Sequence, residues 1–382
     1  MSNISQRLQA IDALRGLVIL IMMVDHVRET FYLHHQVPDP MIISSTEEPL
    51  FFSRVLAHIC APVFVVLTGL SAYLYQSKNN SISMTREFLL KRGLFLIFLE
   101  LVVINFAWTG VFPPDVIYLQ VIWAIGLSMV VLAALIGLSI KILWVIGLTI
   151  VFGHNLLDHI SFTDVPILNN IWLVLHERGW IEFGNVVKFR TSYPILPWIG
   201  VITLGYCLGS QVFNPTVQAI KRNKVLLKFA GISIGLFILL RLLNVYGDQA
   251  WSVMPTSTET FMSFFNLTKY PPSLLFILWN VGIGLLLLVG LQKVETKSWI
   301  KPLIVFGSVP MFFYIVHLYV LKLLYLIAVA MFGTNFGDYF GVSHVSTLWL
   351  IALSLCIVLY PIMLKFSKFK HQNKHIAILK YF

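Results

Sequence analysis

The chain has 382 residues, of which 58% are hydrophobic and 12% are charged, and its formal net charge is +10. Because soluble domains carry roughly a quarter charged residues, this composition excludes a soluble globular protein and indicates an integral membrane protein. The basic charge does not indicate nucleic-acid binding, since the Lys and Arg residues gather beside apolar segments. The three cysteines lie inside apolar runs and have no metal-ligand spacing, so no metal is expected.

Windows of about 20 apolar residues recur along the chain and predict ten membrane-spanning helices. The predicted spans are 11–33, 53–76, 88–109, 117–137, 142–160, 191–212, 225–245, 272–292, 303–332 and 345–366. With the N-terminus inside, eighteen Lys and Arg residues fall on inner segments and four on outer segments. This bias places both termini in the cytoplasm. We therefore expect an all-α, polytopic membrane helix bundle that forms one domain over residues 1–382.

The longest outer loops run over about 161–190 and 246–271. In the first of them, the stretch "WLVLHERGWIEFG" (172–184) is rich in Trp and Leu. Such a composition predicts a short helix that lies in the membrane interface.

The first predicted helix, "AIDALRGLVILIMMVDHVRETFY", carries many ionisable residues for a membrane span. Arg15 and His26 are eleven residues apart, so they share one stripe of the helix and lie roughly 16 Å apart along its axis. Asp12 is expected to pair with Arg15, and Glu29 or Asp25 to hold the imidazole of His26. Ionisable groups at membrane depth are costly and normally face a polar cavity.

A structural interpretation of the same helix is also open. Asp12 and Arg15 would then form an interfacial anchor pair, and Arg28 and Glu29 a surface pair. His26 would be a buried bundle histidine with a satisfied ring.

The second span places His58 four residues after Arg54, near the same outer boundary as His26. Two histidines that converge on an outward cavity favour acid–base or nucleophilic chemistry. Other polar residues of the outer half are candidates for substrate binding, with packing or snorkelling as the competing interpretation. These candidates are Asn105, Arg241, Lys269, Tyr270 and His317.

Several stretches together resemble a known family. The Arg-x10-His spacing of the first helix is similar to that of bacterial sugar acyltransferases of the O-antigen acetylase type. The wider pattern resembles bacterial relatives of heparan-alpha-glucosaminide N-acetyltransferase. The matching stretches are "RLQAIDALRGLVILIMMVDH", "HICAPVFVVLTGLSAYL", "YPILPWIGVITLGYCLG", "TKYPPSLLF" and "FGSVPMFFYIVHLYV".

The resemblance implies transfer of an acetyl group from cytosolic acetyl-CoA to a sugar beyond a bacterial inner membrane. The lysosomal enzyme keeps its catalytic histidine about ten residues before the position of His58, where this chain reads "SSTEEPLFF". That enzyme also has asparagine at the position of His26. The sugar acyltransferase pattern points to His26 instead.

The expected roles follow from the chemistry of acyl transfer. His26 acts as the general base or carries an acyl-imidazole, and His58 or Arg241 binds the developing oxyanion. Asp12 and Arg15 meet a phosphate or the pantetheine arm of CoA, while Arg92, with its basic neighbours on the inner loops, holds the nucleotide phosphates. Acetyl-CoA is expected as a co-substrate, without a tightly bound cofactor.

Two rival functions belong to other classes. In a proton-coupled transporter, Asp25, His26, Glu100 and Lys322 would form a relay, although the sequence has no inverted repeat. A non-catalytic scaffold or sugar-binding protein is the third interpretation. The expected partners are the lipid bilayer, acetyl-CoA and a sugar or glycan acceptor, and a homodimer is compatible with the sequence.

The charge bias predicts the side of the membrane on which the tail lies. A reporter that is active only in the cytoplasm should be active when it is fused after Lys370. A reporter that is active only outside the cytoplasm should be silent at the same position. The reverse pattern would invert the assignment of outer and inner loops.

Overall fold

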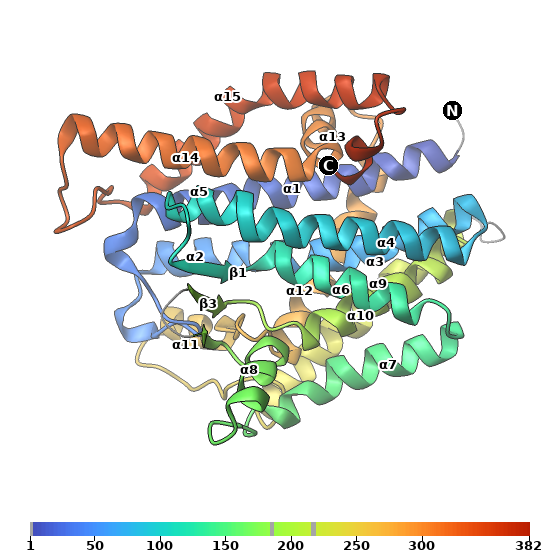
Figure 1. Cartoon of the computed structure of the whole chain (residues 1–382). Coiled ribbons are helices and arrows are strands. Elements are labelled where there is room, and N and C mark those ends of the chain that lie inside the picture. The colour runs from blue at the N-terminus through green and yellow to red at the C-terminus, as the bar shows by residue number, and fades with distance from the viewer. Residues whose placement is uncertain (1–2, 184–186, 215–218) are drawn as a thin grey trace. The chain divides into compact units, whose positions relative to one another are not determined.

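The computed structural model describes residues 3–183, 187–214 and 219–382, and most of them are helical (Figure 1). The chain forms two compact units, each of which joins segments that are distant in sequence. Unit 1 comprises Met1–Cys60, Val253–Asn266 and Leu287–Phe382, and unit 2 comprises Ala61–Ser252 and Leu267–Leu286.

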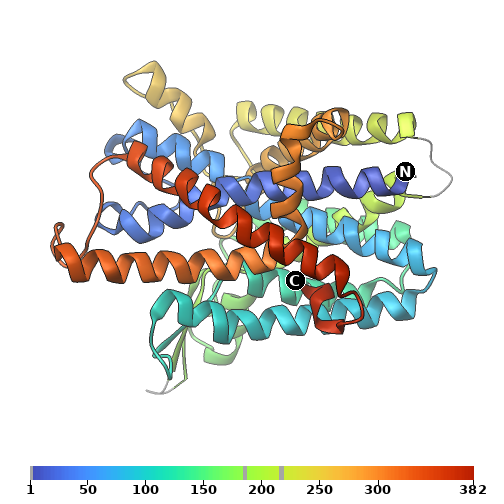
Figure 2. The same ribbon diagram turned by 90° about the horizontal axis from the view of Figure 1, so that it is seen from above.

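Unit 1 is organised around its first helix, α1, which packs against α2, α13, α14 and α15. Within this unit α15 runs diagonally across α14 (Figure 2). The helices of unit 1 are α1 (Asn3–Phe31), α2 (Glu48–Ala57), α11 (Ser257–Phe265), α13 (Lys301–Ser308), α14 (Pro310–Phe332) and α15 (Val345–Gln372). Short 3-10 turns η1 (Leu33–His35), η2 (Ile43–Ser45), η5 (Ser298–Ile300) and η6 (Ala377–Tyr381) complete it.

Unit 2 holds a second set of helices and a small sheet. Its helices are α4 (Ile82–Phe98), the π-helical turn η3 (Leu99–Ile104), α5 (Asn105–Thr109), α6 (Val121–Leu135), α7 (Ile140–Gly153), the 3-10 turn η4 (His154–Leu157), α8 (Pro166–Leu175), α9 (Leu196–Val212) and α10 (Ala219–Leu243). Helix α3 (Cys60–Asn79) lies in this unit except for its first residue, and α12 (Leu274–Val294) contributes its part up to Leu286.

Residues that favour the start of a helix occur at the N-termini of many of these helices. Proline occupies one of the first two positions of α2, α8, α9, α13 and α14, where its missing N–H costs no helical hydrogen bond. The side chain of Ser81 caps α4 by accepting from the amide of Met84. Thr256 and Glu259 form a reciprocal capping box at the start of α11.

Helices α1 and α13 approach so closely that two positions exclude a side chain. A Cβ on Gly16 would overlap the backbone of Leu303, and a Cβ on Gly307 would overlap the backbone of Asp12. Small residues at such crossings let helices gain dispersion energy where the hydrophobic effect contributes little. These two glycines therefore fix how α1 sits in unit 1.

In unit 2, α6 is bound at both ends by side chains from one neighbouring stretch of chain. The amide of Trp123, in its first turn, donates to Glu100 Oε2 over 2.9 Å, and Arg86 Nε donates to the carbonyl of Ala133, in its last turn, over 3.0 Å. An acidic group at the N-terminus and a basic group at the C-terminus both complement the helix dipole. Glu100 is 1% exposed, so this contact also gives a deeply buried carboxyl group its partner.

The structure is mostly helical, as expected, and a small three-stranded sheet accompanies the helices. Strand β1 (Val116–Leu119) pairs in parallel with β3 (Val187–Thr191), which pairs in antiparallel with β2 (Gly179–Phe183). The interfacial helix expected over 172–184 is therefore wrong beyond Leu175, where α8 ends, and Gly184 lies outside the described residues. Alternating aromatic and β-branched residues fit a pleated strand, and here that preference decides the structure.

Six of the described helical segments are long and apolar enough to cross a membrane. They are Glu48–Asn79, Ile140–Leu157, Lys221–Leu243, Leu274–Val294, Pro310–Phe332 and Val345–Gln372. Each of the ten predicted spans contains a helix, but ten crossings and the cytoplasmic termini stay predictions. In the fourth predicted span the helix begins at Val121, because strand β1 precedes it.

The close contact of α1 with α13 predicts that a methyl group added at this crossing destabilises the protein, whereas one added at an open helical position does not. Gly16→Ala should lower the free energy of unfolding by about 1–3 kcal/mol, since a backbone must move to admit the methyl group. Gly290→Ala is the matched control, because a Cβ at that helical position meets nothing within 4 Å. Thermal unfolding of both variants in detergent measures the difference. Equal melting temperatures would contradict the proposed packing.

Candidate functional site

Two groups of ion pairs lie along α1. Arg15 Nη1 binds Asp12 Oδ1 over 3.0 Å, as the three-residue spacing predicts. Arg28 binds Asp25 Oδ1 over 2.9 Å and Glu29 Oε1 over 3.0 Å. Because Arg28 is only 3% exposed, its guanidinium needs these carboxylates, and the pair with Glu29 is not the surface pair of the structural interpretation.

The partner of His26 is a residue 291 positions away in the sequence. His26 Nδ1 lies 2.6 Å from Nε2 of His317, and the two rings are nearly parallel. The expectation that Glu29 holds the imidazole is corrected, since this carboxylate binds Arg28. Asp25 and Glu29 of α1 thus pair with Arg28, and α14 supplies the partner of His26.

The hydrogen bonds of His317 fix where the protons of the pair lie. His317 Nδ1 is 2.7 Å from the carbonyl oxygen of Phe313, which can only accept, so Nδ1 carries the proton. In an uncharged His317, Nε2 is then an acceptor, and His26 Nδ1 must donate to it. The lone pair of His26 is therefore on its Nε2, which is the arrangement that a general base requires.

Aromatic rings pack around this histidine pair. Phe313 stacks on His317 with centroids 4.8 Å apart, and Tyr314 meets the edges of His26 and His317 at 5.5 Å each. His317 is 0% exposed, and its expected role toward the substrate stays a prediction. Sequence reasoning missed Phe313 as a partner, although its spacing of four residues before His317 places both on one helix face.

His58 lies at the C-terminal end of α2, in unit 1. Its amide donates to the carbonyls of Arg54 and Val55, and the residue is 4% exposed. Arg54 in turn lies 3.7 Å from the carboxylate of Asp39. The four-residue spacing of Arg54 and His58 is thus helical, as expected, while the catalytic role of His58 stays a prediction.

Two expected substrate ligands act as anchors in unit 2. The amide of Asn105 donates to the carbonyl of Val116 over 2.9 Å and accepts from the amide of Tyr118 over 3.1 Å, so both of its ends hold strand β1. Arg241 Nη1 donates to the carbonyl of Gln249 over 2.7 Å, which fastens the chain after α10. Both ends of the Asn105 side chain thus bind the backbone, and its role toward the substrate stays a prediction.

Lys269 and Tyr270 lie in a turn that one buried carboxylate holds from both sides. Asp248 accepts from the amide and hydroxyl of Thr268, over 3.1 and 2.7 Å, and from the hydroxyl of Ser273 over 2.5 Å. Burial raises the pKa of Asp248 above its ordinary value, although these hydrogen bonds offset part of the effect. The turn is therefore fixed before any ligand binds.

Tyr270 is the centre of a cluster of aromatic and basic side chains. Its ring faces Lys269 Nζ at 5.1 Å and the guanidinium of Arg178 at 5.0 Å, and its hydroxyl lies 3.3 Å from that of Tyr193. Lys269 is 6% exposed, Tyr270 is half-buried and Arg178 is exposed. Elsewhere in unit 2, Arg92 lies over the ring of Phe88 at 5.9 Å, and its expected role toward CoA stays a prediction.

The anchoring role of Asn105 can be separated from substrate binding. Asn105→Ala leaves an amide and a carbonyl of half-buried β1 residues without their side-chain partner, and should cost about 1–3 kcal/mol of unfolding free energy. Asn170→Ala, on half-buried α8, is the control and should leave the melting temperature near that of the wild type. A normal melting temperature of Asn105→Ala with a raised KM would instead indicate substrate contact.

Comparison with known protein families assigns the chain to one of them. The family described as heparan-alpha-glucosaminide N-acetyltransferase, catalytic, matches residues 7–235, which is more than half of the chain and includes His26 and His58. His317 and Tyr270 lie beyond the matched region. No curated protein matches the chain. With its six membrane-length helices, the chain belongs to the family of heparan-alpha-glucosaminide N-acetyltransferase catalytic domains.

Proposed function

We propose that the protein is a bacterial inner-membrane acetyltransferase that moves an acetyl group from acetyl-CoA to an amine or hydroxyl of a sugar beyond the membrane. Membership in the family supports the reaction class. One contact carries the assignment of the base, namely the bond of His26 Nδ1 to His317 Nε2. It directs the lone pair of His26 to Nε2, in a histidine that is 9% exposed.

In the proposed step, His26 Nε2 removes the proton of the acceptor N–H or O–H. The acceptor nitrogen or oxygen forms a bond to the thioester carbonyl carbon, and the carbon–sulfur bond then breaks. The CoA thiolate leaves and takes the proton from His26, which returns to its uncharged form. General bases of this kind contribute about 10²–10⁴ to the rate.

His317 is a positioning residue in this scheme. When His26 becomes an imidazolium, its Nδ1–H still donates to His317 Nε2, and a charge-assisted bond is stronger than a neutral one. The bond of His317 to the carbonyl of Phe313 keeps the acceptor nitrogen turned toward His26. His317 thus sets the ring orientation and stabilises the charge that appears during the reaction.

Other residues are candidates for contacts with the substrates. In unit 1, Arg15, paired with Asp12, is proposed to meet a CoA phosphate or the pantetheine arm, and His58 to donate to the oxyanion. In unit 2, Arg92 is a further candidate for the nucleotide phosphates. The Tyr270 cluster offers a ring face and hydrogen-bond donors, which suit a sugar acceptor, because sugars present apolar faces and hydroxyl groups.

Binding of acetyl-CoA separates this proposal from a proton-coupled transporter or a scaffold. A ligand that binds only the folded state raises stability by about 2.7 kcal/mol at 100 times its Kd. Acetyl-CoA should therefore raise the melting temperature of the purified protein. No shift at millimolar acetyl-CoA, together with no turnover on amino sugars and glycans, would favour the rival functions.

The histidine pair predicts a graded series of variants. His26→Ala should lower kcat by about 10²–10⁴. His317→Phe keeps an aromatic ring but removes the acceptor, whereas His317→Gln can accept from His26 and donate to Phe313, so the Gln variant should be the more active of the two. Turnover of acetyl-CoA and the melting temperature are measured for each variant.

His375→Ala, at an exposed histidine of the tail, is the control for this series. In the His317 variants kcat should fall while the KM for acetyl-CoA stays close to the wild-type value, since His317 touches neither substrate. Full activity of His26→Ala would move the chemistry to another residue. Equal activity of His317→Phe and His317→Gln would remove the positioning role.

A further inference from the structure

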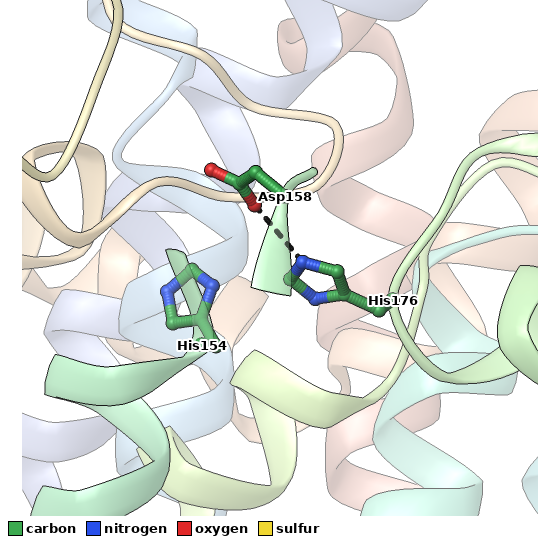
Figure 3. Close-up of side chains that lie close together, drawn as sticks. All are labelled: His154, Asp158 and His176. Atoms are coloured by element: carbon green, nitrogen blue, oxygen red, sulfur yellow. Dashed lines mark hydrogen bonds and ion pairs between the residues drawn. The ribbon is translucent and has the colours of Figure 1, made fainter. Parts of the chain in front are cut away.

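A cluster of two histidines and an aspartate lies at the junction of α7 and α8 in unit 2. His154 begins the 3-10 turn η4 directly after α7, Asp158 directly follows that turn, and His176 directly follows α8. Figure 3 shows the three side chains converging on one point. None of them takes part in the acetyl transfer proposed above.

The ligand atoms of this cluster are close enough to share one ion. One nitrogen of each histidine and one oxygen of Asp158 lie within 4.8 Å of one another, and His176 Nε2 is 2.9 Å from Asp158 Oδ1. Zinc bonds of about 2.0–2.2 Å place ligand atoms roughly 3.3–3.5 Å apart, so modest side-chain rotations close the site.

His154 provides a second, independent indication of a ligand. It is 1% exposed, and neither of its ring nitrogens has a hydrogen-bond partner in the described part of the chain. A buried polar group without a partner costs about 1–3 kcal/mol, so native proteins rarely keep one. His176 is also buried, and its Nδ1 has no partner among the same residues. A metal ion satisfies a histidine nitrogen without requiring another protein donor or acceptor.

We propose that His154, Asp158 and His176 bind one divalent transition-metal ion, with zinc as the best fit and solvent as the fourth ligand. Two imidazoles and a carboxylate are ligands that zinc accepts in a four-coordinate site. Asn155 supports the set from outside, because its Nδ2 donates to Asp158 Oδ2 over 2.8 Å while its Oδ1 accepts from the amide of Leu274 over 2.9 Å.

The ion would join the end of α7 to the end of α8 and close the segment between them. Asp158 has a side chain that is 40% exposed, so solvent and the ion reach the site through its carboxylate. The expectation of no metal rested on cysteine spacing alone, whereas His154 and Asp158 are four residues apart and His176 follows in a separate helix. Holding these ends together stabilises the strand β2, which begins three residues after His176.

Zinc binding to the purified full-length protein tests the proposal. After removal of any histidine tag and treatment with a chelator, calorimetric titration with zinc chloride should give one site per chain and a higher melting temperature. His154→Ala and His176→Ala should weaken zinc binding by more than about 100-fold, since even indirect ligand partners are worth 10- to 100-fold. His159→Ala, at the exposed histidine beside Asp158, should bind zinc like the wild type.

Asp158→Asn keeps an acceptor for His176 but removes the charge, so it should fold normally without metal and still bind zinc weakly. Cobalt(II) gives a second readout, because four-coordinate cobalt absorbs visible light strongly and the absorption should be absent in the His154 variant. The proposal would be overturned if the wild type bound no zinc, or less than one ion per chain, at 100 µM. Unchanged zinc binding in His154→Ala and His176→Ala would overturn it as well.

Discussion

Burial of polar groups in apolar helices is the constraint on which the rest of this structure depends. An ionisable side chain without a partner costs several kcal/mol in such surroundings, so a partner within the fold or a bound ligand stabilises it. Arg28 meets two carboxylates of its own helix, His26 meets His317, and Glu100 meets the first turn of α6. These matches join α1 to α14 in unit 1 and the π-helical turn to α6 in unit 2. The glycines at the α1–α13 crossing add the close backbone approach that keeps α1 in register with its neighbours.

The same constraint explains why several polar side chains bind backbone groups. A helix end presents backbone groups that lack partners, and a strand edge does the same. Arg86 and Glu100 satisfy the two ends of α6, Asn105 satisfies strand β1, and Arg241 satisfies a carbonyl of the loop after its helix. Backbone groups are present in every helix and strand, whereas substrate atoms are not. A polar side chain near the end of an apolar helix is therefore often bound by the nearest unpaired backbone group.

Sequence patterns predicted the local structure better than they predicted contacts between residues distant in the sequence. Apolar windows located a helix in every expected span, and three-residue spacing predicted the pair of Asp12 with Arg15. Helical periodicity also placed Glu29 on the face of His26, but it carried no information about Arg28 as a competitor for the carboxylate or about His317, 291 residues away. The strand over Gly179–Phe183 was missed because Trp and Leu content was weighed above β-propensity. Long-range partners and backbone edges are properties of the fold, which a single sequence does not display.

The choice of a second histidine as the partner of His26 has a physical reason. A carboxylate partner would orient the ring equally well, but it would bring a permanent charge into apolar surroundings and require further donors to compensate it. An uncharged His317 brings no permanent charge, and its N–H is satisfied by the carbonyl of Phe313 within its own helix. In the proposed reaction, the pair acquires charge only while His26 holds the proton of the acceptor, and it loses that charge when the proton passes to the leaving thiolate. A base built in this way limits the cost of burial to the short period in which the charge is useful, and it leaves Asp25 and Glu29 to satisfy the buried guanidinium of Arg28.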